Sequence, residues 1–146
     1  MCCRITFSKR IDQTWIPHNV EVAIDSLTWY AIWVVAGLHI GFGAAELFLW
    51  ERLTPLLQIY DADSAKITAP VGMNMGVYNG VVAACLLWLL HTYGLGVDQI
   101  RSLGTLLLVS IIIAGIFGGF TIKRTIPIFQ SLPAAIALGL LWRPVM

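Results

Sequence analysis

Charged residues are scarce in this chain of 146 amino acids. Asp, Glu, Lys and Arg make up only 12% of it, about half the share that is usual for soluble domains. Nine basic residues stand against eight acidic ones, a formal charge of +1, and they lie in short clusters between long apolar runs. This distribution argues against a soluble domain, and with no basic stripe we predict no nucleic acid as a partner.

Cysteine is also rare, with only Cys2, Cys3 and Cys85 present. The third lies in an apolar segment far along the chain from the other two, so the spacing fits neither a disulfide framework nor a metal site. The sequence also lacks a phosphate-binding loop, a haem motif and a nucleophile elbow. We therefore predict no metal site and no cofactor.

Long apolar runs fill most of the chain, of which 58% is hydrophobic. Four runs each approach the roughly 20 residues that a helix needs to cross a bilayer. In lipid every backbone polar group must be satisfied within its own segment, which predicts helices. The fold class expected is therefore all-α, a bundle of four transmembrane helices in antiparallel hairpins. The predicted spans are 26–50, 69–92, 102–122 and 125–142.

The charged segments define the expected organisation. Residues 1–25 form a polar N-terminal leader, and residues 26–146 form the four-helix transmembrane domain. Residues 51–68 carry five charges and are predicted to be an aqueous or interfacial connection, the longest in the chain. Lys123 and Arg124 close the third span, so the fourth begins almost at once. Basic residues near the span ends favour a cytoplasmic location for both charged connections.

Glycines recur at four-residue spacing in two of the predicted spans. Gly72, Gly76 and Gly80 lie in the second span, and Gly115 and Gly119 lie in the third. Small residues at this spacing allow helix backbones to approach closely in a membrane. We predict that Gly76 and Gly80 face another helix at close range.

An acid and an imidazole share one face of the first predicted span. His39 and Glu46 are seven residues apart, and seven steps of an α-helix return to within about 20° of the start. Gly43 lies between them on the same face. A carboxylate within a span costs roughly 2.5–3.5 kcal/mol, so it usually faces the bundle interior.

Polar residues in the later spans are candidate partners for this pair. In the second span Asn74 and Tyr78 are one turn apart, while Asn79 is turned a further 100° or so. In the fourth span Gln130 lies three residues before Pro133. We predict that Asn74 or Tyr78 lies within hydrogen-bond reach of the first-span pair. The candidate polar cluster comprises His39, Glu46, Asn74, Tyr78, Asn79 and Gln130.

Three functions are compatible with this cluster. The first is a membrane-embedded site that binds or chemically alters a small apolar molecule, with Glu46 and His39 exchanging protons. The second is a proton-coupled transporter with an architecture like that of small multidrug-resistance proteins, for which a homodimer is expected. The third is a structural or interaction subunit, in which the polar groups form hydrogen bonds worth about 0.6–2 kcal/mol each. The residues leave open whether the protein is an enzyme.

Four sequence blocks carry a resemblance to a known family. They read GAAELFLWERLTP (43–55), NMGVYNGVVAACLLW (74–88), AGIFGGFTIKRTI (114–126) and FQSLPAAIALGLL (129–141). In order and spacing they resemble the small bacterial membrane proteins grouped as domain of unknown function 1304, over about residues 27–142. The family typically has Asn-Gln-Gly where this chain has Asn74-Met75-Gly76. The resemblance implies four helices in a bacterial inner membrane and a lipid bilayer as partner, but no particular activity.

Overall fold

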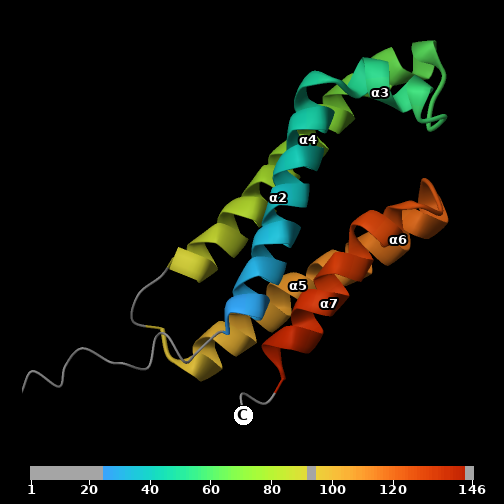
Figure 1. The fold of residues 1–146 in the computed structure, drawn as a ribbon. Coiled ribbons are helices and arrows are strands. Elements are labelled where there is room, and N and C mark those ends of the chain that lie inside the picture. Colours follow the sequence, from blue (N-terminus) through green and yellow to red (C-terminus); the bar gives the residue numbers. More distant parts are fainter. Residues whose placement is uncertain (1–24, 92–94, 144–146) are drawn as a thin grey trace, which may run out of the picture.

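The computed structural model describes residues 25–91 and 95–143, and every regular element in them is a helix (Figure 1). The all-α prediction is therefore confirmed for this part of the chain. Apart from its last residue, the predicted leader lies outside the described residues. The helices are α2 (Ser26–Phe48), α3 (Trp50–Leu56), α4 (Ala62–His91), α5 (Val97–Thr121), α6 (Ile126–Phe129) and α7 (Ser131–Leu141).

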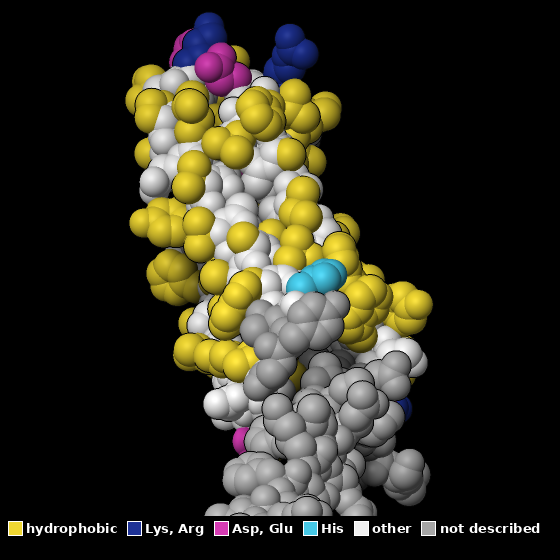
Figure 2. Space-filling model, turned by 90° about the vertical axis from the view of Figure 1, so that its left-hand side faces the viewer, with side chains coloured by type: hydrophobic (Ala, Val, Ile, Leu, Met, Phe, Trp, Pro, Cys, Tyr) yellow, Lys and Arg dark blue, Asp and Glu magenta, His cyan; other side chains and the backbone are white. Residues whose placement is uncertain are grey.

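Three of these helices, α2, α4 and α5, are long and apolar enough to cross a membrane. Only 22–28% of the most apolar stretch of each is buried inside the protein, so most of their apolar side chains face outward. Figure 2 shows charged side chains gathered at one end of the molecule and apolar ones along its flank. By length and composition, this is an integral membrane protein.

The fourth predicted span, 125–142, is present as a shorter apolar segment that is divided in two. It runs over Ile126–Leu141, with α6 ending at Phe129 and α7 beginning at Ser131. Pro133 has no N–H to donate, and its ring clashes with the carbonyl group four residues earlier. That carbonyl belongs to Phe129, which accounts for the interruption at this point.

The connection predicted over residues 51–68 is mostly helical, and the second long helix begins earlier than predicted. Helix α3 occupies its first part, and α4 begins at Ala62 instead of near residue 69. The Asp61 carboxylate accepts a hydrogen bond from the Ser64 backbone N–H at 2.7 Å, an N-terminal capping contact. This contact holds the pKa of Asp61 below its usual value. Pro70 consequently lies inside α4.

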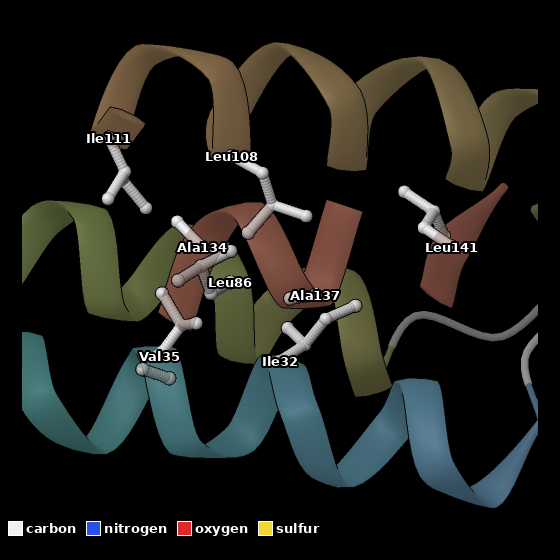
Figure 3. Close-up of a cluster of buried hydrophobic side chains, with 9 residues drawn as sticks. Ile32, Val35, Leu86, Leu108, Ile111, Ala134, Ala137 and Leu141 are labelled. Carbon is white, nitrogen blue, oxygen red and sulfur yellow. The ribbon is translucent and has the colours of Figure 1, made fainter. Parts of the chain in front are cut away.

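The four longer helices pack as two pairs, α2 with α4 and α5 with α7, and α7 also packs on α2. Figure 3 shows side chains from all four converging on one apolar core. Two alanines of α7 are fully buried there, and their small size lets α7 lie close to the other helices. The core residues are Ile32, Val35, Ala36, Leu86, Leu108, Ile111, Ala134, Ala137 and Leu141.

Helices α2 and α4 touch backbone to backbone at two glycines. A Cβ atom on Gly76 would lie 2.8 Å from the Gly43 carbonyl oxygen, and one on Gly43 would lie 2.9 Å from the Gly76 oxygen. The prediction for Gly76 is therefore confirmed. Gly80 also lies close to α2, since a Cβ atom on Gly43 would lie 3.4 Å from the Gly80 backbone nitrogen, but a Cβ atom on Gly80 itself would meet nothing within 4 Å. The prediction for Gly80 is therefore confirmed for the close approach and wrong for the direction in which the residue faces. Four residues advance an α-helix by about 400°, so the Cα–Cβ direction at Gly80 is turned about 40° from that at Gly76.

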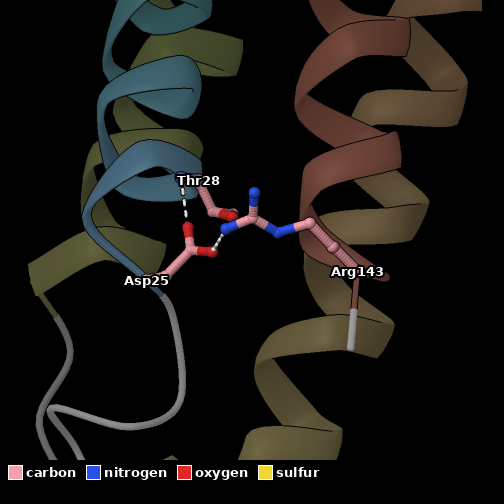
Figure 4. A network of polar contacts seen from close by, with 3 residues as sticks. All are labelled: Asp25, Thr28 and Arg143. Carbon is pink, nitrogen blue, oxygen red and sulfur yellow. Dashed lines mark hydrogen bonds and ion pairs between the residues drawn. The ribbon is translucent and has the colours of Figure 1, made fainter. Parts of the chain in front are cut away.

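Polar contacts tie the helices together at both ends of the bundle. At one end the Asp25 carboxylate accepts the Thr28 backbone N–H at 2.7 Å, which caps α2, and it forms an ion pair with Arg143 after α7 (Figure 4). At the other end the Lys123 ammonium group donates to the Leu57 carbonyl oxygen. The segment joining α5 to α6 therefore lies beside the one joining α3 to α4.

Candidate functional site

A cavity of about 310 Å³ opens between α2, α4, α5 and the junction of α6 with α7. Its wall is mainly apolar and includes Met75, Val82, Leu107 and Ile111. A few polar side chains interrupt this surface. They belong to His39, Tyr78, Asn79, Ser110 and Gln130.

His39 lines this cavity and carries a buried hydrogen-bond acceptor. Its side chain is 1% exposed, and its Nδ1 atom lies 2.9 Å from the Val35 carbonyl oxygen. A carbonyl oxygen only accepts, so Nδ1 must carry the proton, and Nε2 of the neutral ring carries a lone pair. Nε2 is buried without a hydrogen-bond partner in the described part of the chain. A buried acceptor left unpaired costs about 1–3 kcal/mol, and a hydrogen-bond donor placed against it would remove that cost.

Glu46 is connected to the cavity through Asn79. The Asn79 amide nitrogen donates to a Glu46 carboxylate oxygen at 2.6 Å, and the same Asn79 side chain lines the cavity. The glycine contact between α2 and α4 brings the two residues together, since a Cβ atom on Gly43 would lie 3.5 Å from the Asn79 Cβ. A larger residue at Gly43 would push α4 and its amide away from the carboxylate.

The partner of Glu46 differs from the sequence prediction. Asn79 makes the hydrogen bond, whereas Asn74 is exposed and lies away from the cavity. Tyr78 lines the cavity, but it is 65% exposed and donates to neither first-span residue. The prediction that Asn74 or Tyr78 would be the partner is therefore wrong.

The rotation of α4 about its axis explains this difference. The buried residues of α4 include Gly72, Gly76 and Ala83, and Gly76 makes the contact with α2. Asn79 lies three residues after Gly76 and four before Ala83, a spacing that places it on the same face. Combining the glycine spacing with the polar positions would have selected Asn79 from the sequence.

The break between α6 and α7 supplies the far wall of the cavity. Gln130 lies at the break and lines the cavity. The next residue, Ser131, donates its hydroxyl to the Ile112 carbonyl oxygen of α5 at 2.9 Å. A Cβ atom on Gly115 would collide with the Ser131 hydroxyl oxygen, so this glycine allows the hydrogen bond. The interruption of the fourth segment therefore holds an amide side chain at the cavity.

The structure brings five of the six candidate residues into one polar group. Four line the cavity directly, Glu46 joins them through Asn79, and Asn74 stands apart. Sequence reasoning missed Ser110, whose hydroxyl is occupied by the Leu106 carbonyl oxygen of its own helix at 2.7 Å. In the described segments no group of three His, Cys, Asp or Glu side chains is placed to hold a metal ion. A functional role for the group stays a prediction.

The fold and the cavity define the class, a helical integral membrane protein with a polar group inside its apolar region. A family model described as "Protein of unknown function (DUF1304)" matches residues 33–142. Because this match covers most of the sequence, the chain belongs to that family, as its sequence blocks predicted. Searches of curated proteins and of solved structures give no match.

Proposed function

We propose that this protein is a multi-pass protein of the bacterial inner membrane that binds a small, largely apolar molecule between α2, α4 and α5. The cavity, of about 310 Å³, is at the lower end of the size range of small-molecule sites. A mainly apolar wall with a few convergent polar groups is also typical of such sites. The membrane would supply apolar ligands at high local concentration.

The lone pair of His39 Nε2 is the observation on which this proposal rests. Nε2 is buried and unpaired in the described residues, and it belongs to a residue that lines the cavity. The ligand is therefore expected to carry a hydroxyl or N–H group that donates to Nε2. Asn79 and Gln130 line the same cavity and offer amide groups to a second polar atom of the ligand.

Matched apolar probes with and without a donor test this proposal. We expect 2-naphthol to raise the melting midpoint of the full chain in detergent, and its methyl ether, which has no donor, to have much less effect. His39→Phe removes the acceptor and should abolish the difference between the probes. Ser110→Ala, at a hydroxyl already bonded to its own helix, is the control and should keep it. Equal effects of both probes on the unmodified protein would contradict the proposal.

Proton-coupled transport is the second candidate, and the hydrogen bond between Glu46 and Asn79 favours it. Protonation turns one carboxylate oxygen from an acceptor into a donor, which Asn79 could meet only with its carbonyl oxygen. If the Asn79 amide turns to accept that O–H, its N–H groups face the cavity, so that proton binding changes the hydrogen-bonding groups that a ligand meets there. Glu46→Gln keeps the size and cannot titrate. A pH gradient should drive uptake of the probe into proteoliposomes with the unmodified protein but not with this variant; equal uptake by both would rule the candidate out.

A further inference from the structure

A second hollow, separate from the cavity, lies where α5 ends and α6 begins. Its volume is about 570 Å³. Ile116 and Phe120 of α5 and Pro127 of α6 form its apolar wall, and Lys123 and Arg124 of the connecting turn form its polar rim. The hollow therefore combines two cations with a hydrocarbon surface.

The backbone holds this arrangement in place. A Cβ atom on Gly119 would lie 2.5 Å from Cγ of Pro127 and 2.8 Å from its Cδ, so the proline ring rests directly on α5. Within the turn the Lys123 N–H donates to the Gly118 carbonyl oxygen at 3.1 Å, and the Ile126 N–H donates to the Lys123 oxygen at 3.0 Å. The two cations are thus carried on a hydrogen-bonded turn.

The positive charge of the rim is largely uncompensated. Lys123 uses one of its N–H groups on the Leu57 carbonyl oxygen, which leaves two for another acceptor. Arg124 is exposed and has no hydrogen bond or ion pair with the described residues. Among those residues no Asp or Glu lines the hollow. An anion would therefore meet two cations without competition from a carboxylate.

The position along α5 places these cations at the level of lipid headgroups. From residue 102 to residue 121 the helix has no charged side chain, and Lys123 and Arg124 follow directly. Phe120 is 87% exposed and Ile116 is 45% exposed, which continues the apolar surface from the cations toward the middle of the helix. A molecule that fits both parts has an anionic head and a hydrocarbon tail.

We propose that this hollow binds one anionic phospholipid, with its phosphate on Arg124 and Lys123 and an acyl chain along Ile116 and Phe120. Arginine suits this role because its planar guanidinium group donates two parallel hydrogen bonds to phosphate oxygens. Basic pockets beside membrane helices are a recurrent means of binding anionic headgroups. A zwitterionic lipid carries a cation of its own, which would be repelled by the rim.

Lipid titration of the full chain tests the proposal. The protein in neutral detergent is titrated with phosphatidylglycerol or phosphatidylcholine of equal chain length, and bound lipid is counted by native mass spectrometry. We expect one phosphatidylglycerol to bind in preference to phosphatidylcholine. Arg124→Gln should weaken that preference about fivefold, the equivalent of the roughly 1 kcal/mol that one basic side chain contributes at a membrane surface. Arg124→Lys, which keeps the charge, should restore most of it.

Two comparisons make the result specific to the hollow. Arg52→Gln removes an exposed cation from α3, outside the hollow, and should leave the preference intact. Inorganic phosphate, which has no hydrocarbon tail, should not displace the lipid at equal concentration. An undiminished preference in Arg124→Gln, an equal loss in Arg52→Gln, or displacement by inorganic phosphate would each overturn the proposal.

Discussion

At the scale of single residues, the polar groups at the cavity differ in whether they have hydrogen-bond partners. Asn79 gives Glu46 a hydrogen bond at 2.6 Å, and His39 is held by the Val35 carbonyl oxygen through one ring nitrogen. A carboxylate among apolar helices is costly by itself, and the amide lowers that cost. The imidazole has no second partner in the described residues, so the protein satisfies the carboxylate of Glu46 but leaves one ring nitrogen of His39 without a hydrogen bond.

Removing the amide should therefore destabilise the bundle, while removing a neighbouring amide should not. We expect Asn79→Ala to lower the free energy of unfolding by about 0.6–2 kcal/mol, the range measured for hydrogen bonds between membrane helices. Asn74→Ala is the matched control on the same helix, because Asn74 is exposed. Thermal melting in detergent gives the comparison. Equal midpoints for the two variants would show that the Glu46 hydrogen bond contributes nothing to stability.

At the scale of elements, the glycine contact between α2 and α4 decides how closely the two helices approach. The four-residue spacing identified Gly76 from the sequence, but spacing alone leaves the rotation and crossing angle of a helix undetermined. For that reason the sequence did not distinguish Gly76 from Gly80, whose Cβ position points into open space, and it assigned the wrong partner to Glu46. The start of the second long helix was misplaced because Asp61 caps it before the apolar run begins. The shared face of His39 and Glu46 needed only helical geometry, so it was predictable.

Substitution of Gly76 and Gly80 tests which of the regularly spaced glycines has its Cβ position against another helix. Gly76→Leu places a side chain against the Gly43 carbonyl oxygen and the Leu47 side chain, and overpacking of this kind costs about 1–3 kcal/mol or more. Gly80→Leu enters open space, and its effect should stay within about 0.5 kcal/mol. Melting midpoints of the pair give the result. A Gly80 variant as unstable as the Gly76 variant would refute the described crossing of α2 and α4.

At the scale of the whole molecule, Asp25 and Arg143 join the beginning of α2 to the end of α7. The Thr28 backbone N–H and, to a lesser extent, the Arg143 guanidinium group lower the pKa of Asp25 below 3.8. A lowered pKa in the folded state means that the stabilisation is present above pH 3.8 and is lost as the pH falls below it. Acid should therefore weaken this link between the ends of the bundle.

Two substitutions at Asp25 separate the stability that the helix cap contributes from the stability that the ion pair contributes. Asparagine still caps a helix but cannot pair with Arg143, whereas alanine does neither. At neutral pH the melting midpoints should fall in the order Asp25, Asp25→Asn, Asp25→Ala. In both variants the melting midpoint should also fall less on acidification, because residue 25 no longer carries a carboxylate that acid can protonate. A midpoint of Asp25→Asn equal to that of the unmodified protein would mean that the ion pair does not stabilise the bundle.

The nitrogen resonances of the His39 ring test the central claim, that the cavity receives a hydrogen-bond donor, most directly. In protein labelled with ¹⁵N at histidine, assigned by comparison with His39→Phe, Nδ1 should be protonated and Nε2 should carry the lone pair. Adding 2-naphthol should shift the Nε2 resonance toward that of a hydrogen-bonded nitrogen, and its methyl ether should leave it unchanged. An Nε2 resonance that does not move at saturating 2-naphthol, or an Nε2 atom already protonated in the free protein at neutral pH, would contradict the account.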